Sequence, residues 1–350
     1  MQNKKANIAI IALVAVFTIA GAYTLLRPPA EKPVPRAPEQ TVPAEPAEPS
    51  PPPSPPPSVN PALPIPDEPV FDRTKYLQEP EITVWRADKR YIESMPLETY
   101  LEGVIAKEME PNWPVEALAA QAIASRTLTI HALETGTIKK LRNADVSTAK
   151  EELQAYAPEK VNKRVKQAVM ETRGQVLVYG DHLVSAIYSS CDGQISATKE
   201  ESFPKQLGTE TPYFQSVKDN CFQNAPKEYQ NWTVAIPAQE VAAAIGYQGN
   251  PQDIQILEKG PSGRILFIGA GEKKLYGSEF RRIVGYDRLK STLIREMTYS
   301  NGNFIFKGQG WGNGVGMCQW GAYTYAQQGM MAEGILKHYY AGAEIVKLWE

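Results

Sequence analysis

GVIAKEMEPNWPVEALAAQAIASRT, residues 103–127, joins two predicted helices through a bend of asparagine, tryptophan and proline. The first helix, over 96–109, carries apolar residues at the three- and four-residue spacing of one helical face. The second starts at Pro114, which suits a first helical position, and continues to Glu134 before Gly136 supplies a stop. Because alanine recurs along the second helix, it can approach its neighbours closely, and we expect it at the centre of the core.

Short strands and hairpins fill the rest of the folded part. Residues 81–86 alternate like a strand, and 175–179 and 183–190 flank a turn as an antiparallel hairpin. Residues 231–298 mix strands with two short helices, and we leave open whether they form a second lobe. Because helices and hairpins follow one another in no strand–helix–strand rhythm, the sequence predicts an α+β fold for residues 73–350.

The N-terminal residues 1–27 form a membrane segment. Residues 6–26 carry no charge and are long enough to cross a hydrocarbon core of about 30 Å at roughly 1.5 Å per residue. Ala20 and Ala22 also fit the cleavage site of a signal peptide, which is the alternative. The apolar run continues past that site and favours a retained anchor. Both interpretations export the rest of the chain, so we expect a single-pass protein of the cell membrane with an extracytoplasmic folded domain.

Residues 28–72 form a proline-rich linker. Of the 29 prolines, 18 lie within 28–70, and such a tract favours extended polyproline II over a packed core. At roughly 3.1 Å per residue it could hold a domain on the order of 100 Å from the bilayer. A passive low-complexity linker is the alternative.

Charge and missing motifs exclude several classes of function. The chain of 350 residues has 37 basic and 39 acidic residues, which argues against a nucleic-acid partner. Its three histidines are scattered, and it has neither H-E-x-x-H nor G-x-S-x-G, so no local zinc-hydrolase or serine-hydrolase motif is present. Cys191 and Cys221 could form a disulfide in an exported protein, which would leave Cys318 as a buried thiol.

Two features could take part in catalysis or in ligand binding. Glu108 ends an apolar helix before a turn, where partial burial would raise its pKa and keep a proton for general acid catalysis; a solvated helix-end glutamate is the alternative. The loop 308–316 has glycine at every second position, which permits close approach of the backbone to an extended polar ligand. Trp311 and Trp320 supply flat faces for stacking on such a ligand. A tight structural crossover is the alternative for the individual glycines.

Three separated stretches resemble, in the same order, the stage II sporulation protein D family, also called the amidase-enhancer family. They are MPLETYLEGVIAKEMEPNWPVEALAAQAIASRT (95–127), AIYSSCDGQISATKEESF (186–203) with TPYFQSVKDNC (211–221), and GQGWGNGVGMCQWGAYTYAQQGMMAEGILKHYYAGAEI (308–345). The resemblance covers nearly the whole folded part, and the last stretch is highly specific.

The resemblance implies a peptidoglycan lytic transglycosylase. Such an enzyme cuts the β-1,4 bond between N-acetylmuramic acid and N-acetylglucosamine in peptide-stripped glycan strands and leaves a 1,6-anhydro end. The alternative is a non-catalytic glycan-binding factor that stimulates an N-acetylmuramoyl-L-alanine amidase. The implied partners are glycan strands and an amidase or a sporulation or division complex.

The resemblance also assigns residues. The catalytic glutamate of the family falls on Glu108. The remaining matched or cleft-facing positions are Gln121, Arg126, Tyr188, Ser189, Trp311, Asn313, Gln319 and Trp320. For Gln121 and Arg126 an internal salt bridge or cap is an equal alternative, and Trp320 could belong to the core.

The chain departs from the family pattern at several positions. Asn313 stands where the family often has histidine, and Cys318 replaces a serine, which leaves room for reduced activity. Some relatives bind zinc near the cysteine of the C-G-G turn, with a histidine close by. Here Gln194 and Ser196 follow Cys191, so we expect no metal and no cofactor.

Overall fold

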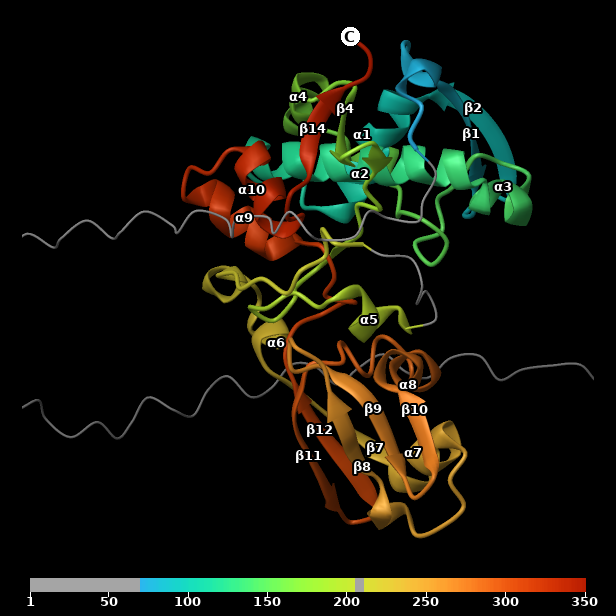
Figure 1. The fold of residues 1–350 in the computed structure, drawn as a ribbon, viewed down its shortest axis with the longest axis vertical. Helices are drawn as coiled ribbons and strands as arrows, with labels where there is room; N and C mark the ends of the chain where they lie inside the picture. Colours follow the sequence, from blue (N-terminus) through green and yellow to red (C-terminus); the bar gives the residue numbers. More distant parts are fainter. Residues whose placement is uncertain (1–69, 205–210) are drawn as a thin grey trace, which may run out of the picture. The chain divides into compact units, whose positions relative to one another are not determined.

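The computed structural model describes residues 70–204 and 211–350 (Figure 1). The predicted membrane segment and the linker up to residue 69 lie outside the described residues. Within the described part of the chain, no helix is both long and apolar enough to cross a bilayer. The side chain of Phe71 is buried, and its backbone N–H donates to the carbonyl of Asp181 over 2.8 Å.

The helices are α1 (Leu97–Glu108), α2 (Val115–Thr135), α3 (Thr137–Arg142), α4 (Lys163–Glu171), α5 (Lys199–Ser202), α6 (Lys227–Gln230), α7 (Ala238–Ile245), α8 (Gly277–Val284), α9 (Gln319–Gln327) and α10 (Ala332–Tyr339). The strands are β1 (Glu81–Arg86), β2 (Tyr91–Pro96), β3 (Val146–Ser147), β4 (Gln175–Tyr179), β5 (His182–Leu183), β6 (Tyr188–Ser189), β7 (Trp232–Pro237), β8 (Gln255–Lys259), β9 (Ile265–Ala270), β10 (Lys273–Tyr276), β11 (Ile294–Ser300), β12 (Asn303–Gly308), β13 (Met317–Cys318) and β14 (Glu344–Lys347).

Helix α2 is the centre of the main core. It packs against α1, α4, α9, α10 and β4, and Figure 1 shows it running between these elements. Its alanines are buried on more than one side, which is why so many elements reach its backbone. Gly136 ends the helix in the left-handed conformation, at φ 60°. The sequence predictions for α1 and α2 are confirmed to within two residues.

The strands form small sheets with the orders β2-β1-β3, β14-β4-β5, β10-β9-β8, β11-β12-β7 and β13-β6. The pairs are antiparallel, apart from the parallel pairs β1–β3 and β6–β13. This mixture of helices and mainly antiparallel sheets confirms the predicted α+β class.

The hairpin predicted from 175–190 is only partly right. β4 pairs with β5, but that second strand ends at Leu183. The chain then bends, because the Ile187 N–H donates to the Ser185 carbonyl over 2.6 Å. Tyr188 and Ser189 pair instead with β13 near the carboxyl terminus, in parallel. A partner from so far along the chain leaves no sign in the local alternation.

Two hydrophobic clusters support the unit. The first surrounds α1, α2, β4 and the two C-terminal helices. The second runs from Trp232 to Phe306 and packs α7 and α8 against β7, β9 and β12. All of its buried residues except Phe304 and Phe306 lie in the segment 231–298, and we propose that this segment is a lobe in its own right.

Candidate active site

A cleft of about 740 Å³ has Glu108 in its wall, and we call it the Glu108 cleft. Its lining comes from segments far apart in the sequence: the end of α1, residues 150–153, 187–190, 202–204, 276–292, the glycine loop at 311–313 and the start of α9. The main core and the segment 231–298 therefore both contribute walls. Of the residues predicted from the sequence, the cleft gathers Glu108, Tyr188, Ser189, Trp311, Asn313 and Gln319.

Glu108 is the last residue of α1, and its side chain is only partly exposed. Its Oε1 accepts a hydrogen bond of 2.7 Å from the backbone N–H of Ala155. Burial raises the pKa of Glu108 above its ordinary value. Hydrogen bonds from Ala155, Gln319 and Tyr188 and the charge of Lys107 act in the opposite direction without cancelling the effect of burial on the pKa. A carboxyl group in this setting can hold a proton nearer neutral pH, as a general acid requires.

Gln319 and Tyr188 line the cleft with Glu108, and both act to lower its pKa. Gln319 is nearly buried, and its Nε2 donates to Gln121 Oε1 over 3.3 Å. Gln121 Nε2 in turn donates to Ser125 Oγ over 3.0 Å, so the amides form a chain that leads from α2 to Glu108. Gln121 is fully buried and acts through Gln319, beneath the cleft surface.

The Tyr188 hydroxyl donates its single hydrogen to Gln154 Oε1 over 3.1 Å. It also lies close enough to Glu108 for each group to influence the pKa of the other. Burial, followed by the charge of Glu108, raises the pKa of Tyr188 well above its ordinary value. The hydroxyl therefore stays protonated and can donate to Glu108 once that carboxyl is ionised.

Next to Tyr188, Ser189 offers a free hydroxyl. Its Oγ is buried and has no hydrogen-bond partner within residues 70–204 and 211–350. An unpaired buried hydroxyl is unfavourable unless a ligand or water satisfies it. Since Ser189 lines the cleft, its hydroxyl can bond to a hydroxyl or amide group of a ligand.

The glycine loop forms the facing wall. The side chain of Asn313 is already hydrogen-bonded to the protein. Its Oδ1 accepts from the Val315 N–H over 2.7 Å, and its Nδ2 donates to the Tyr188 carbonyl in β6 over 3.3 Å. Glycine is required at position 316, where φ is 68° and an added Cβ would lie 1.9 Å from the carbonyl oxygen of Ile187. The loop is thus held against β6 by close backbone packing.

Trp311 lies in the cleft wall with part of its surface exposed. Its ring meets Tyr229 edge-on at 4.8 Å, and the Lys290 ammonium lies 4.6 Å above it. Its backbone exchanges two hydrogen bonds with Cys191, of 2.7 and 2.9 Å. A tryptophan fixed in this way offers a rigid face for the apolar side of a sugar ring.

Arg126 and Trp320 do not line the cleft. Arg126 is fully buried and forms a paired bond with Glu98, with distances of 3.0 and 2.7 Å. The internal salt bridge, rather than a cleft-facing role, is therefore what the structure shows for Arg126. Trp320 packs at 4.6 Å on Trp113 and at 5.5 Å on Tyr323.

Among the other carboxylates of the cleft, Glu152 already has hydrogen-bond partners. Arg142 binds it in bidentate fashion, and the Ser147 hydroxyl donates to it over 2.6 Å. The hydrogen bond with Arg142 is the first cause that lowers the pKa of Glu152. Glu152 is thus held ionised, whereas the pKa of Glu108 is raised.

The sequence reasoning missed the Ala155 N–H and the cleft wall from 276–292. A backbone donor carries no side-chain signature, so nothing in the sequence could have indicated Ala155. The wall comes from the segment 231–298, and only the tertiary fold brings it to Glu108.

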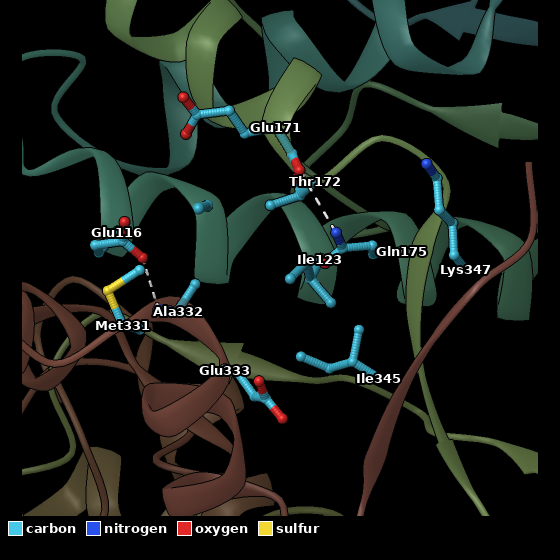
Figure 2. A pocket seen from close by; sticks show the side chains of 11 residues that line it. Glu116, Ile123, Glu171, Thr172, Gln175, Met331, Ala332, Glu333, Ile345 and Lys347 are labelled. Carbon is cyan, nitrogen blue, oxygen red and sulfur yellow. Dashed lines mark hydrogen bonds between the residues drawn. The ribbon is translucent and has the colours of Figure 1, made fainter. Parts of the chain in front are cut away.

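A smaller cavity of about 430 Å³ lies between α2, α4, α10 and β14 (Figure 2). Among the described residues none lines both this cavity and the Glu108 cleft. Its carboxylates have partners: Glu116 accepts from the Ala332 N–H over 2.8 Å, Glu171 from the Gln167 amide, and Glu333 pairs with Lys337. The Glu108 cleft is therefore the better candidate for chemistry.

Comparison with known proteins supports the resemblance. A family model described as "Stage II sporulation protein" matches residues 86–179, which include Glu108. Stage II sporulation protein D of Bacillus amyloliquefaciens is 29% identical over 278 residues, covering 75% of this chain and 78% of that protein. An uncharacterized protein of Brachyspira hyodysenteriae is 32% identical over 260 residues, covering 73% and 68%. The amidase enhancer of Bacillus subtilis is 27% identical over 292 residues, covering 70% of this chain and 40% of that protein.

Proposed function

Because this chain belongs to the stage II sporulation protein D family and has a role related to the cell wall, we propose that it is a peptidoglycan lytic transglycosylase with Glu108 as its general acid and base. One observation carries the proposal: a carboxyl with a raised pKa lies in a cleft lined also by a fixed tryptophan and by a serine hydroxyl that has no partner among the described residues.

The reaction suits a single protonated carboxyl. Glu108 donates its proton to the bridging oxygen as the bond from C1 of the muramic acid to that oxygen breaks. The 6-hydroxyl of the same sugar attacks C1, and the Glu108 carboxylate accepts its proton, so the acid is restored. Most glycosidases need a second carboxylate to activate water or attack C1. Here the nucleophile belongs to the substrate, and intramolecular attack lowers the entropic part of the barrier.

The experiment compares Glu108→Gln with Glu110→Gln in the purified full chain. Glu110 is an exposed glutamate two residues away and is the matched control. On glycan strands freed of peptides, the unchanged protein and Glu110→Gln should release anhydro-ended fragments, identified by mass. Glu108→Gln should be slower by roughly 100-fold or more, because the proton donor is lost while the shape is kept. Release by Glu108→Gln at the normal rate would exclude Glu108 as the acid.

The second candidate is a glycan-holding factor that stimulates an amidase. The relative named amidase enhancer favours it. The two candidates differ in what the protein does alone, without amidase: an enzyme releases anhydro-ended fragments, whereas a holding factor releases none and accelerates only the amidase. If the holding role is correct, Glu108→Gln should stimulate an amidase as well as the unchanged protein does.

The proposed substrate lies outside the cytoplasmic membrane, which agrees with the anchor expected in residues 1–27. We therefore also propose that the folded part is extracytoplasmic and works on glycan strands, with an amidase or a sporulation or division complex as partner. Protease treatment of intact cells, compared with broken cells, tests this placement, because only an exported domain is cut in both.

A further inference from the structure

Tyr286 lines the Glu108 cleft from the segment 231–298, and the proposed reaction gives it no role. It lies two residues after the end of α8, and 47% of its surface is exposed. Its ring rests on the guanidinium of Arg281, whose Cζ lies 4.6 Å from the ring centroid. Since Arg281 covers one face of the ring, the exposed surface includes the opposite face, which a ligand in the cleft can reach.

Arg281 keeps the ring in place because its own side chain is fixed. It is buried, its Nε donates to the Leu289 carbonyl over 2.8 Å, and its Nη2 donates to the Lys290 carbonyl over 2.9 Å. Burial lowers the pKa of Arg281 to about 10, so the group is still a cation at neutral pH. A cation over the face of a tyrosine ring attracts it, which holds Tyr286 in one orientation before any ligand arrives.

Lys290 joins this tyrosine to the tryptophan of the same cleft. Its carbonyl, which accepts from Arg281, also accepts from the Gly312 N–H over 2.9 Å. Its ammonium lies 4.6 Å above the ring of Trp311. Tyr286 and Trp311 are therefore each backed by a cation, and both are tied to one residue. Two aromatic rings with fixed relative positions suit a ligand made of repeating flat units, such as a chain of sugar rings.

We propose that Tyr286 stacks on a sugar ring of the glycan strand and forms a second subsite, separate from the sugars on which Glu108 acts. This inference rests on the proposed function and adds a place that holds the strand. The C–H face of a pyranose ring is apolar and matches the flat apolar surface of a tyrosine.

The contacts of the cleft wall give the reason to place this subsite away from the reacting bond. Glu108 and Tyr286 belong to different parts of the fold, α1 and the segment 231–298. The contacts that lead from one to the other pass in turn through Tyr188, Asn313, Gly312, Lys290 and Arg281. A strand that reaches both ends of this path must extend beyond the two sugars that flank the cut bond.

A structural role is the rival interpretation. Tyr286 would then only cover the buried guanidinium of Arg281, and removing its ring would lower the stability of the protein without changing its affinity for glycan. A surface for a protein partner would leave the glycan affinity unchanged as well.

Binding measurements on the full-length chain with Glu108→Gln, which should leave strands uncut, test the subsite. Adding Tyr286→Ala should weaken the binding of long peptide-stripped strands about fivefold and leave the affinity for a single disaccharide unit unchanged. Adding Tyr286→Phe keeps the ring and should keep the affinity. Tyr299→Ala is the matched control, because Tyr299 is 41% exposed in β11 and does not line the cleft.

The outcomes separate this inference from the proposed function. Equal affinity of the Tyr286→Ala and Tyr299→Ala chains for long strands would overturn the subsite and leave the role of Glu108 intact. An equal loss for the disaccharide would place the ring at the reacting sugars and would also overturn a separate subsite. A chain that binds no stripped glycan at all would exclude the proposed function together with the subsite.

A second measurement needs no change at Tyr286. Tyrosines of the Glu108→Gln chain are nitrated with and without long stripped strands, and the modified residues are located by peptide mass. Bound strands should slow the nitration of Tyr286 and leave that of Tyr299 unchanged. Equal nitration of Tyr286 with and without saturating strands would contradict the proposal.

Discussion

Gln319 Nε2 lies 3.3 Å from Gln121 Oε1, an amide pair that joins residues 198 positions apart beneath the Glu108 cleft. Gln319 also lies close enough to lower the pKa of Glu108, and its bond to Gln121 fixes which way its amide faces. Gln121 is thus a positioning residue for a carboxyl that it does not touch.

Replacing Gln121 with Leu should lower the kcat for release of anhydro-ended fragments about tenfold, with little change in KM. The Gln319 amide loses its acceptor, and Glu108 loses a fixed donor, so the alkaline limb of the pH profile should also move. Gln167→Leu, on the exposed face of α4, is the matched control. Equal kinetics and equal pH profiles for both variants would argue against the positioning role.

The raised pKa of Glu108 predicts how activity and stability depend on pH. Since a general acid works in its protonated form, activity should fall as the pH rises through the pKa of Glu108. The free energy of unfolding should fall over the same range, because the buried carboxyl loses its proton less readily in the folded chain than in the unfolded chain. The stability contribution is complete below the ordinary pKa of about 4.5 and disappears above the raised one.

Denaturant titrations of the unchanged chain and of Glu108→Gln at several pH values test this dependence. Glutamine does not titrate, so the difference in unfolding free energy between the two proteins should grow as the pH rises above 4.5. A difference that is constant with pH would mean that folding does not perturb Glu108.

The buried pair Arg126–Glu98 should matter for stability and not for chemistry. Arg126→Met leaves Glu98 buried without its cation, and we expect a loss of about 3 to 5 kcal/mol in chemical unfolding. Adding Glu98→Leu should recover part of that loss, although the Gly174 N–H would then lack its acceptor. Arg288→Met, at the more exposed pair with Glu240, should cost about 1 kcal/mol or less. If Arg126→Met and Arg288→Met lowered the free energy of unfolding by similar amounts, burial would not explain the importance of the Arg126–Glu98 pair.

Gly316→Ala should destabilise the protein more than Gly329→Ala. Both glycines have positive φ, 68° and 86°, and in the left-handed region a side chain costs roughly 1 to 2 kcal/mol. Only at Gly316 would the new Cβ also collide with a backbone carbonyl, whereas Gly329 has nothing within 4 Å of that position. Thermal unfolding of the two variants measures the difference, and equal shifts would mean that the loop relaxes without cost.

The sequence predicts the helices well because their signals are local. Apolar spacing, Pro114 and Gly136 define α1 and α2, and the same spacing places Glu108 at the end of α1. The prediction from the sequence fails for β6, because its partner β13 lies more than a hundred residues later in the chain. It also cannot show that Arg126 turns inward to Glu98, or that Ala155 offers its N–H to Glu108. Those contacts depend on elements that meet only in the folded chain.

The parallel pairing of β6 with β13 has a consequence for the timing of assembly. Glu108 emerges early during synthesis, whereas Gln319 follows more than two hundred residues later. A growing chain therefore carries Glu108 before it carries the Gln319 amide. The surroundings of Glu108 that the structure shows are completed only once the segment with β13 and α9 has been made.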